Sequence, residues 1–206
     1  MTMIDLFADD DRDNLTPLSL IERDLPVSGV DLFVGDKRAA ADPELLSRHN
    51  IVMVLNCAVN LDVNVVTESD PAATALPYGP GFVRYYKLGI IDGPGNPAPM
   101  MLAGYYQLAG LLAQTFPDKP SYPRRETGNV LVLCRGGRSR SVMLTSLYLH
   151  LARADRYPTL DAAIDHVCEA RGIPPETRYK RPKPDLRAAA RWAADMARMI
   201  APHIPD

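Results

Sequence analysis

Residues 129–141 read Asn-Val-Leu-Val-Leu-Cys-Arg-Gly-Gly-Arg-Ser-Arg-Ser. The apolar run before the cysteine is rich in valine and suits a buried strand. The two adjacent glycines allow the backbone angles that a tight turn needs. Residues 141–151 are apolar almost throughout and predict a largely buried helix, with Ser139 or Ser141 as its cap. The segment therefore predicts a strand, a glycine turn and a helix in immediate succession.

This order of elements builds an anion-binding cradle around Cys134. Backbone N–H groups converge there, the helix dipole adds positive potential, and the same field lowers the pKa of a thiol. We expect Cys134 to be a nucleophile that forms a phosphocysteine, with Arg140 holding two phosphoryl oxygens and Ser141 donating a hydrogen bond to the thiolate. The alternative is an inert core cysteine. The residues expected to bind the substrate phosphate are Arg135, Gly136, Gly137, Arg138 and Ser139.

The segment resembles the His-Cys-x5-Arg-Ser/Thr signature of the protein tyrosine phosphatase superfamily, and it is most similar to the dual-specificity branch. Further segments that resemble this branch are residues 31–35, 43–49, 51–56, 88–94 and 159–199. The resemblance implies an α/β fold in which helices flank a central, mainly parallel sheet of about five strands. It implies a phosphomonoester hydrolase in one domain, residues 17–206, behind a flexible lead at residues 1–16.

The resemblance also assigns the general acid to Asp92. This residue begins Asp-Gly-Pro-Gly-Asn-Pro, a turn-rich stretch that suits a mobile loop over a pocket. Its carboxylic acid would protonate the leaving group and its carboxylate would then deprotonate a water molecule. Without the resemblance, Asp92 would be taken for an ordinary residue of an Asp-Gly turn.

One position departs from the signature, because Leu133 precedes the cysteine where the family has histidine. The missing histidine favours a less activated thiol, and the positive charges of Arg135 and Arg138 favour an ionised one. An inactive phosphate-binding module is therefore the main alternative from another functional class. An enzyme of sulfur or arsenate chemistry on a similar loop fits Asp92 less well.

Arg135 and Arg138 also bear on the substrate. Loops of phosphatidylglycerophosphate and tensin-type lipid phosphatases are similar and carry basic residues at both places. Added cations suit a substrate with more than one anionic group. A phosphoprotein of the tyrosine or dual-specificity type and a lipid or inositol phosphate are thus comparable expectations.

Cys57 ends an apolar strand and is a candidate redox partner of Cys134, because tensin-type enzymes carry a cysteine near this place. A reversible disulfide between them is a hypothesis, and packing in the core is the simpler role. Thiol mapping after peroxide treatment tests it, and recovery of two free thiols would exclude the disulfide.

Composition limits the remaining classes. The chain has 206 residues, is 47% hydrophobic and 23% charged, and carries a net charge of −2, as in an ordinary soluble globule. We expect a cytoplasmic protein without membrane insertion, nucleic-acid partner, cofactor or metal; the sequence does not indicate its oligomeric state. A basic cluster at residues 178–187 is interpreted as a solvated face.

The remaining pattern predicts individual elements. Edge strands are expected at residues 18–22, 29–34 and 83–88, and an amphipathic helix at residues 99–116. A later helix should begin after Thr159 and end at Gly172. Three proline-rich loops, residues 61–82, 117–128 and 172–184, are expected to shape substrate selection.

Overall fold

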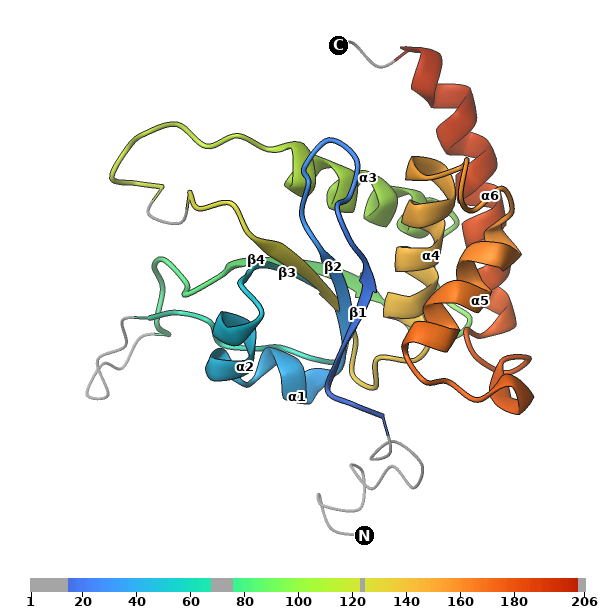
Figure 1. The fold of residues 1–206 in the computed structure, drawn as a ribbon, viewed down its shortest axis with the longest axis horizontal. Helices are drawn as coiled ribbons and strands as arrows, with labels where there is room; N and C mark the ends of the chain where they lie inside the picture. The colour runs from blue at the N-terminus through green and yellow to red at the C-terminus, as the bar shows by residue number, and fades with distance from the viewer. Residues whose placement is uncertain (1–14, 68–75, 123–124, 204–206) are drawn as a thin grey trace, which may run out of the picture.

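A five-stranded sheet forms the centre of the fold (Figure 1). The computed structural model describes residues 15–67, 76–122 and 125–203. The strands are β1 (Leu18–Glu22), β2 (Leu32–Gly35), β3 (Ile51–Ala58), β4 (Arg84–Ile90) and β5 (Asn129–Leu133), in the order β1-β2-β5-β3-β4. Only the β1–β2 pair is antiparallel. The mainly parallel sheet expected from the sequence is confirmed.

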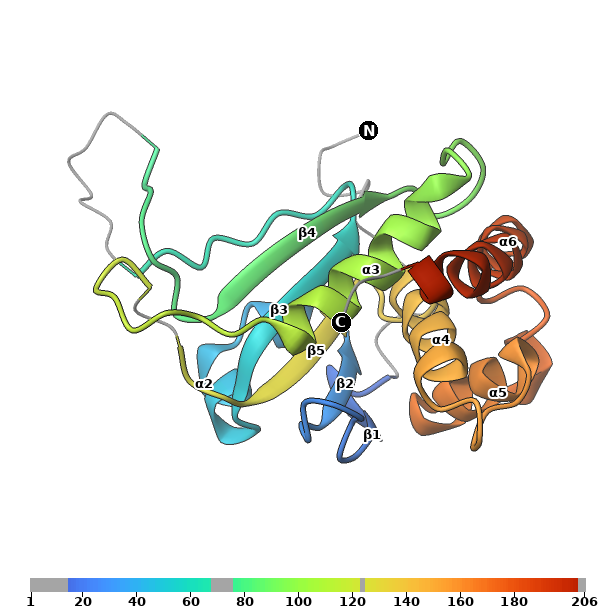
Figure 2. The same cartoon turned by 90° about the horizontal axis from the view of Figure 1, so that it is seen from above.

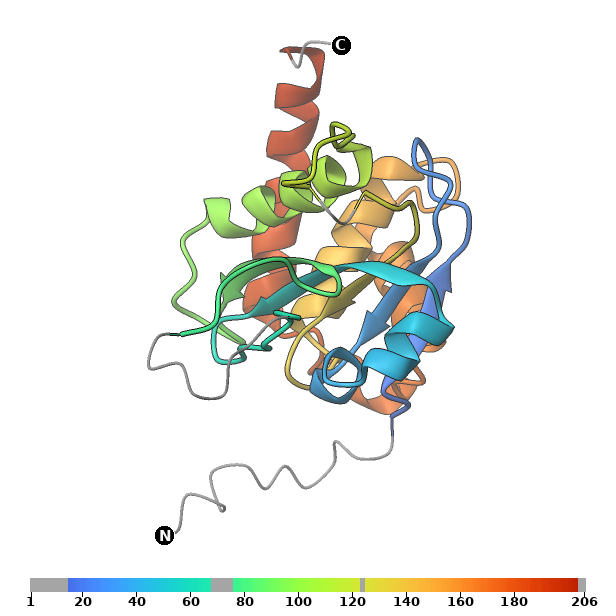
Figure 3. The ribbon, with the colours of Figure 1, turned by 90° about the vertical axis from the view of Figure 1, so that its left-hand side faces the viewer.

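Helices cover both faces of this sheet. They are α1 (Lys37–Ala40), α2 (Pro43–Arg48), α3 (Pro99–Ala113), α4 (Arg140–Ala152), α5 (Leu160–Ala170) and α6 (Pro184–Ile200). The short helices α1 and α2 lie on one face, and α3, α4, α5 and α6 lie on the other (Figure 2). Figure 3 shows α6 beside α3 and α4, which it contacts.

The two-residue period of β5 explains how one strand serves both layers. Val130 and Val132 belong to the larger core under α3–α6, whereas Leu131 and Leu133 belong to the smaller core under α1 and α2. All four side chains are fully buried. A strand covered on both faces reads as a continuous apolar run, which is the pattern seen before Cys134.

The sequence interpretation placed one strand wrongly. Residues 29–34 were expected at an edge of the sheet, but β2 spans Leu32–Gly35 and lies between β1 and β5. Gly29 belongs instead to the turn before it, with φ at +65°. β2 is buried along its whole length, so its apolar residues face two helical layers and not solvent on one side.

The helix termini follow local chemistry. The Thr159 side chain accepts a hydrogen bond from the Ala162 amide at 3.1 Å, and Gly172 has φ at +69° just after α5, as its sequence predicts. Helix α3 stops at Ala113, three residues before the expected end. Helix α4 is buried from Arg140 to His150, which explains its apolar composition.

Parts of some sequence predictions lie outside the described residues. These are most of the lead predicted at residues 1–16, residues 68–75 of the first long loop, residues 123–124 of the second, and residues 204–206 of the predicted domain. Within the described chain, none of the helices has both the length and the apolar character needed to cross a membrane.

Candidate active site

Candidate functional residues gather at the carboxyl ends of the parallel strands. In the sheet register, Leu133 of β5 lies beside Gly35 of β2 on one side and Asn56 of β3 on the other. Cys134 therefore emerges between two neighbouring strands. Open α/β sheets commonly bind ligands at this edge, because loops from several strands meet there.

The Cys134 sulfur is nearly fully buried, with 2% of the residue exposed. Its Sγ lies 3.2 Å from Ser141 Oγ, the contact expected for this serine. Burial by itself raises the pKa of the Cys134 thiol. The Arg140 charge, the Ser141 hydroxyl and the backbone amides of Ser141 and Ser139 outweigh burial and lower the pKa below its usual value. The groups that cause this lowering include no histidine. Leu133, which stands where the family has histidine, packs in the smaller core under α1 and α2.

Arg140 is held on one side of its guanidinium. Its Nη1 donates to Asn60 Oδ1 at 2.9 Å and to the Ile90 carbonyl at 3.2 Å. Its Nε is buried and has no hydrogen-bond partner among the described residues. An orphan donor on a fixed guanidinium is suited to a phosphoryl oxygen. Asn60, which the sequence reading did not single out, is exposed and positions the arginine.

A second buried arginine supports the loop of residues 134–140, which we call the phosphate loop. Arg171 follows α5 and is 1% exposed; its Nε donates to the Gly137 carbonyl at 3.1 Å and its Nη1 to the Thr16 carbonyl at 3.0 Å. Burial lowers the pKa of this guanidinium. A buried guanidinium needs several hydrogen-bond acceptors, and those of Arg171 belong to the glycine turn and to the segment before β1. Arg171 therefore joins these two segments. Sequence reasoning did not identify it.

Gly137 is the glycine that the turn requires. Its φ is +61°, and a Cβ atom there would lie 2.8 Å from both Arg171 Nη2 and the Gly35 carbonyl oxygen. Gly136 does not adopt a positive φ. Of the two glycines in the loop, Gly137 alone combines a left-handed backbone with a close approach to a neighbouring strand.

The segment after β2 supports the loop from the opposite side. Asp36 is buried and caps α1 by accepting from the Arg38 amide at 2.7 Å. The next amide, Lys37 N–H, donates to the Arg135 carbonyl at 3.3 Å. Arg135 is half-buried, and its main chain is thus attached to the N-terminus of α1.

Asp92 lies next to this site, on a loop whose main chain is hydrogen-bonded by the Asn96 side chain. The Asn96 side chain accepts from the Ile91 amide at 2.8 Å and donates to the Ile91 carbonyl at 2.9 Å and the Gly93 carbonyl at 3.0 Å. These bonds tie the Asn96 side chain to the main chain on both sides of Asp92, and the mobility expected for the loop stays a prediction. Asp92 Oδ1 is buried without a hydrogen-bond partner among the described residues, which leaves one carboxyl oxygen uncommitted.

Lys183 connects the Asp92 loop to the phosphate loop. Its Nζ donates to the Asp92 carbonyl at 2.6 Å, and its amide donates to Ser139 Oγ at 3.3 Å. Ser139 occupies the N-cap position of α4 but makes no capping bond with its side chain. Interpreting residues 178–187 as a solvated face is therefore wrong for Lys183, because the folded chain brings it to two site loops.

Cys57 lies next to Cys134 across the β3–β5 pair. Both belong to the larger core, and Asn56, the residue before Cys57, is in register with Leu133. Burial raises the pKa of the Cys57 thiol well above its usual value, and the neighbouring Cys134 raises it further. All three cysteines are free thiols, so the disulfide stays a prediction.

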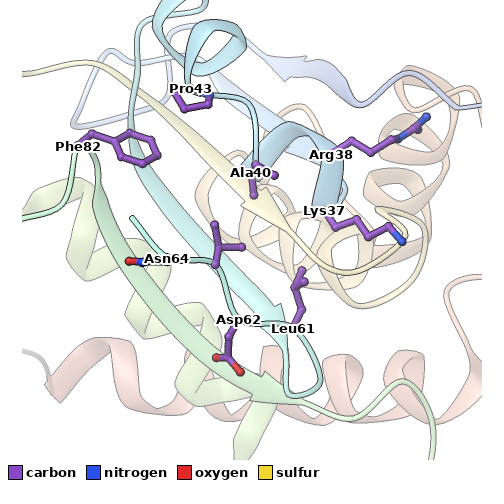
Figure 4. A pocket seen from close by; sticks show the side chains of 10 residues that line it. Lys37, Arg38, Ala40, Pro43, Leu61, Asp62, Asn64 and Phe82 are labelled. Carbon is purple, nitrogen blue, oxygen red and sulfur yellow. The ribbon is translucent and has the colours of Figure 1, made fainter. Parts of the chain in front are cut away.

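Cavities flank the phosphate loop. A groove of about 580 Å³ lies between α1 and the chain after β3, with Lys37 and Arg38 on one wall and Leu61, Asp62 and Asn64 on the other (Figure 4). A second cavity, of about 440 Å³, includes Arg138 of the loop itself. The described residues include no cluster of three His, Cys, Asp or Glu side chains that could hold a metal ion.

No protein-family model and no curated protein matches this chain. Solved structures do match over most of its length. A mouse putative dual specificity phosphatase, complexed with zinc tungstate, is 24% identical, with a TM-score of 0.55, 90% of this chain and 91% of that chain covered. Human DUSP28 is 22% identical, with a TM-score of 0.54 and coverages of 89% and 96%. PTPMT1 in complex with PI(5)P is 14% identical, with a TM-score of 0.54 and coverages of 90% and 99%.

These likenesses define the class of fold. The chain has the fold of the dual-specificity phosphatases, as the sequence resemblance implies. The structure of PTPMT1 in complex with PI(5)P is similar to this same fold.

The Ser141 hydroxyl should control the ionisation of Cys134. Ser141→Ala removes a donor to the thiolate, so the pKa of Cys134 should rise and the acid limb of its reactivity should move to higher pH. Below that pKa, iodoacetamide alkylation should slow roughly 10-fold, as expected for one hydrogen bond to a charged group. The rate is measured across pH by mass spectrometry. Ser146→Ala is the control, because the Ser146 hydroxyl donates to the Val142 carbonyl; an unshifted profile in Ser141→Ala would contradict this assignment.

Gly137 and Gly110 offer a matched pair of glycine substitutions. Gly137→Ala should destabilise the protein by about 1–3 kcal/mol, because alanine is strained at this φ and collides with Arg171 and Gly35. Gly110 lies exposed in α3 with no atom within 4 Å of its added Cβ, so Gly110→Ala should stabilise by about 1 kcal/mol. Urea unfolding measures both. Equal effects of the two substitutions would show that the turn does not depend on Gly137.

Proposed function

We propose that this protein is a cysteine-dependent phosphomonoester hydrolase that acts through a phosphocysteine intermediate. The observation that carries the proposal is the buried Cys134 sulfur, with Ser141, two backbone amides and Arg140 lowering its pKa. Burial alone would have the opposite effect on a cysteine. The dual-specificity phosphatase fold supports the same conclusion.

In the first step the Cys134 thiolate attacks phosphorus. An S–P bond forms as the P–O bond to the leaving group breaks, and Asp92 as a carboxylic acid gives its proton to the departing oxygen. Arg140 and the inward-facing amides of the phosphate loop bind the equatorial oxygens of the transition state. The uncommitted Nε of Arg140 and Oδ1 of Asp92 are available for these contacts.

In the second step water attacks the phosphocysteine. The Asp92 carboxylate accepts a proton from water, a new P–O bond forms, and the S–P bond breaks to release inorganic phosphate. The Ser141 hydroxyl, 3.2 Å from Sγ, donates a hydrogen bond to the thiolate as it leaves. No cofactor or metal takes part in this scheme.

The proposal extends to substrate class. A tyrosine-type or dual-specificity protein phosphatase is the main assignment, and a lipid or inositol phosphate phosphatase is the second candidate. The second candidate is favoured by Arg138, which lines a cavity beside the loop together with further cations. The neighbouring structure with PI(5)P supports it at the level of the fold. One phosphatase domain beginning near residue 17 is part of the same proposal.

The proposal is tested with p-nitrophenyl phosphate. The wild-type protein should hydrolyse it, and Cys134→Ser should lose at least about 1,000-fold in kcat, as expected when a nucleophile is removed. Cys168→Ser is the control, because Cys168 is a free, buried cysteine on α5. Phosphate binding without turnover by the wild type would instead identify an inactive phosphate-binding module.

Asp92 and Lys183 should affect phosphoryl transfer to Cys134 only for substrates whose leaving group needs a proton. In kcat/KM, which reports the steps up to phosphocysteine formation, Asp92→Asn should slow phenyl phosphate about 100-fold or more and leave 2,4-dinitrophenyl phosphate, whose leaving group needs no proton, nearly unchanged. Lys183→Met should show the same pattern more weakly, about 10-fold, because it misplaces Asp92 by removing the bond to its carbonyl.

The exposed Lys119 supplies the control for the lysine substitution, as Lys119→Met. Rate constants for a series of aryl phosphates give the dependence on leaving-group pKa for each variant. Equal losses across the series would mean that Asp92 is not the acid and that Lys183 has only a structural role.

A further inference from the structure

The cavity beside the phosphate loop has an unusual charge composition. Arg138 comes from the phosphate loop, and Lys180 and Arg181 come from the connection between α5 and α6. No acidic residue is among the described residues that line it. Three cations around one hollow contrast with a net charge of −2 for the whole chain, so the positive potential is local.

Two of the cations at this cavity, Lys180 and Arg181, come from the α5–α6 connection. Lys180 is exposed, and its Nζ lies 5.2 Å from the centre of the Tyr179 ring. Arg181 is half-buried. Neither makes an ion pair with a carboxylate of the described residues. By contrast, Arg178 and Arg187 in the same cluster donate to backbone carbonyls.

The cavity is close to Cys134 along the chain, because one of its lining residues belongs to the phosphate loop. Arg138 is four residues from Cys134, so their Cα atoms are at most about 14 Å apart even in an extended chain. Gly137, between them, is attached to Arg171 at the start of the α5–α6 connection. The loop and the connection, which both contribute residues to the cavity, are therefore joined by a hydrogen bond.

The size and lining of the cavity favour a small ligand. Its volume of about 440 Å³ falls in the range of small-molecule sites, and Leu15, Ile173 and Pro174 supply apolar surface between the cations. An apolar surface ringed by cations fits the carbon ring and second phosphate of a compact polyol better than an extended peptide.

We propose that Arg138, Lys180 and Arg181 form a second anion subsite, which selects small substrates that carry a second phosphate besides the one cleaved at Cys134. This rests on the proposed phosphatase function and specifies its substrate as a bisphosphorylated cyclic polyol or a headgroup of that chemistry. Guanidinium and ammonium groups bind phosphate oxygens with charge-assisted hydrogen bonds, so the subsite lowers KM and leaves the chemical step unchanged.

The experiment compares Lys180→Ala/Arg181→Ala with the wild type on three soluble substrates: phenyl phosphate, inositol 4-phosphate and inositol 4,5-bisphosphate. The wild type should prefer the bisphosphate over the monophosphate. The double variant should lose roughly 10-fold or more of kcat/KM for the bisphosphate, through KM, with phenyl phosphate unaffected. Lys119→Ala/Arg125→Ala, on the connection between α3 and β5, removes the same charge at a distance and should behave as the wild type.

A binding measurement separates this inference from the catalytic one. Calorimetry with Cys134→Ser should show that inositol 4,5-bisphosphate binds, and that adding Lys180→Ala/Arg181→Ala weakens binding by a similar factor. If the wild type does not hydrolyse phenyl phosphate, the proposed function fails while this binding result still tests the subsite.

Several outcomes would overturn the subsite. One is an unchanged preference between bisphosphate and monophosphate in the double variant, and another is an equal loss on all three substrates. A third is dependence on Lys180 and Arg181 that appears only with a doubly phosphorylated peptide, which would assign the cavity to a protein substrate. Thermal unfolding of each variant verifies that the fold is intact.

Discussion

The Cys134 sulfur is buried, and a buried thiolate persists only where charge and hydrogen-bond donors replace the water it has lost. Arg140, Ser141 and two amides supply that replacement, and together they reverse the effect of burial on the pKa. These donors must stay directed at the sulfur, so the loop that carries them must be held in a fixed conformation. The phosphate loop therefore constrains the segments that meet at the carboxyl ends of the parallel strands.

That constraint explains why polar groups from several segments hold the loop in place. Arg171 binds the Gly137 carbonyl, the Lys37 amide binds the Arg135 carbonyl, and Asn60 fixes the Arg140 guanidinium. Each of these contacts joins the loop to a different segment of the chain. A loop held from three sides does not have to reorganise when a phosphoryl group enters, which is the basis of electrostatic preorganisation.

The surroundings of the loop divide into two chemical environments. On the α1 side is the groove with Leu61 and Phe82 in its wall, and on the α5–α6 side is the cationic cavity with Arg138. Lys183 links the cavity side to the Asp92 loop, so the connection proposed to bind a second anion also contacts the main chain of Asp92. In the proposed mechanism, substrate selection and proton transfer would thus both depend on one short connection between helices.

The local sequence was sufficient to predict the loop at residues 134–140 and most of the helices and strands. The apolar strand, the glycine turn and the buried helix at residues 129–151 are encoded contiguously, so strand pattern, turn chemistry and helix burial all identify them. Local sequence also favoured the general class of parallel α/β sheet. It misplaced β2 at an edge, because an apolar run does not specify which strands lie on either side of it.

Only the tertiary structure decided which distant residues complete the site. Asn60, Arg171 and Lys183 come from three separate segments, and their signals in the sequence are those of ordinary polar surface residues. The physical reason is that hydrogen bonds to carbonyls and amides of a loop leave no periodicity in the chain. The sequence by itself determined the strand, the glycine turn and the helix around Cys134, and the folding of the sheet and the α5–α6 connection determined which residues surround them.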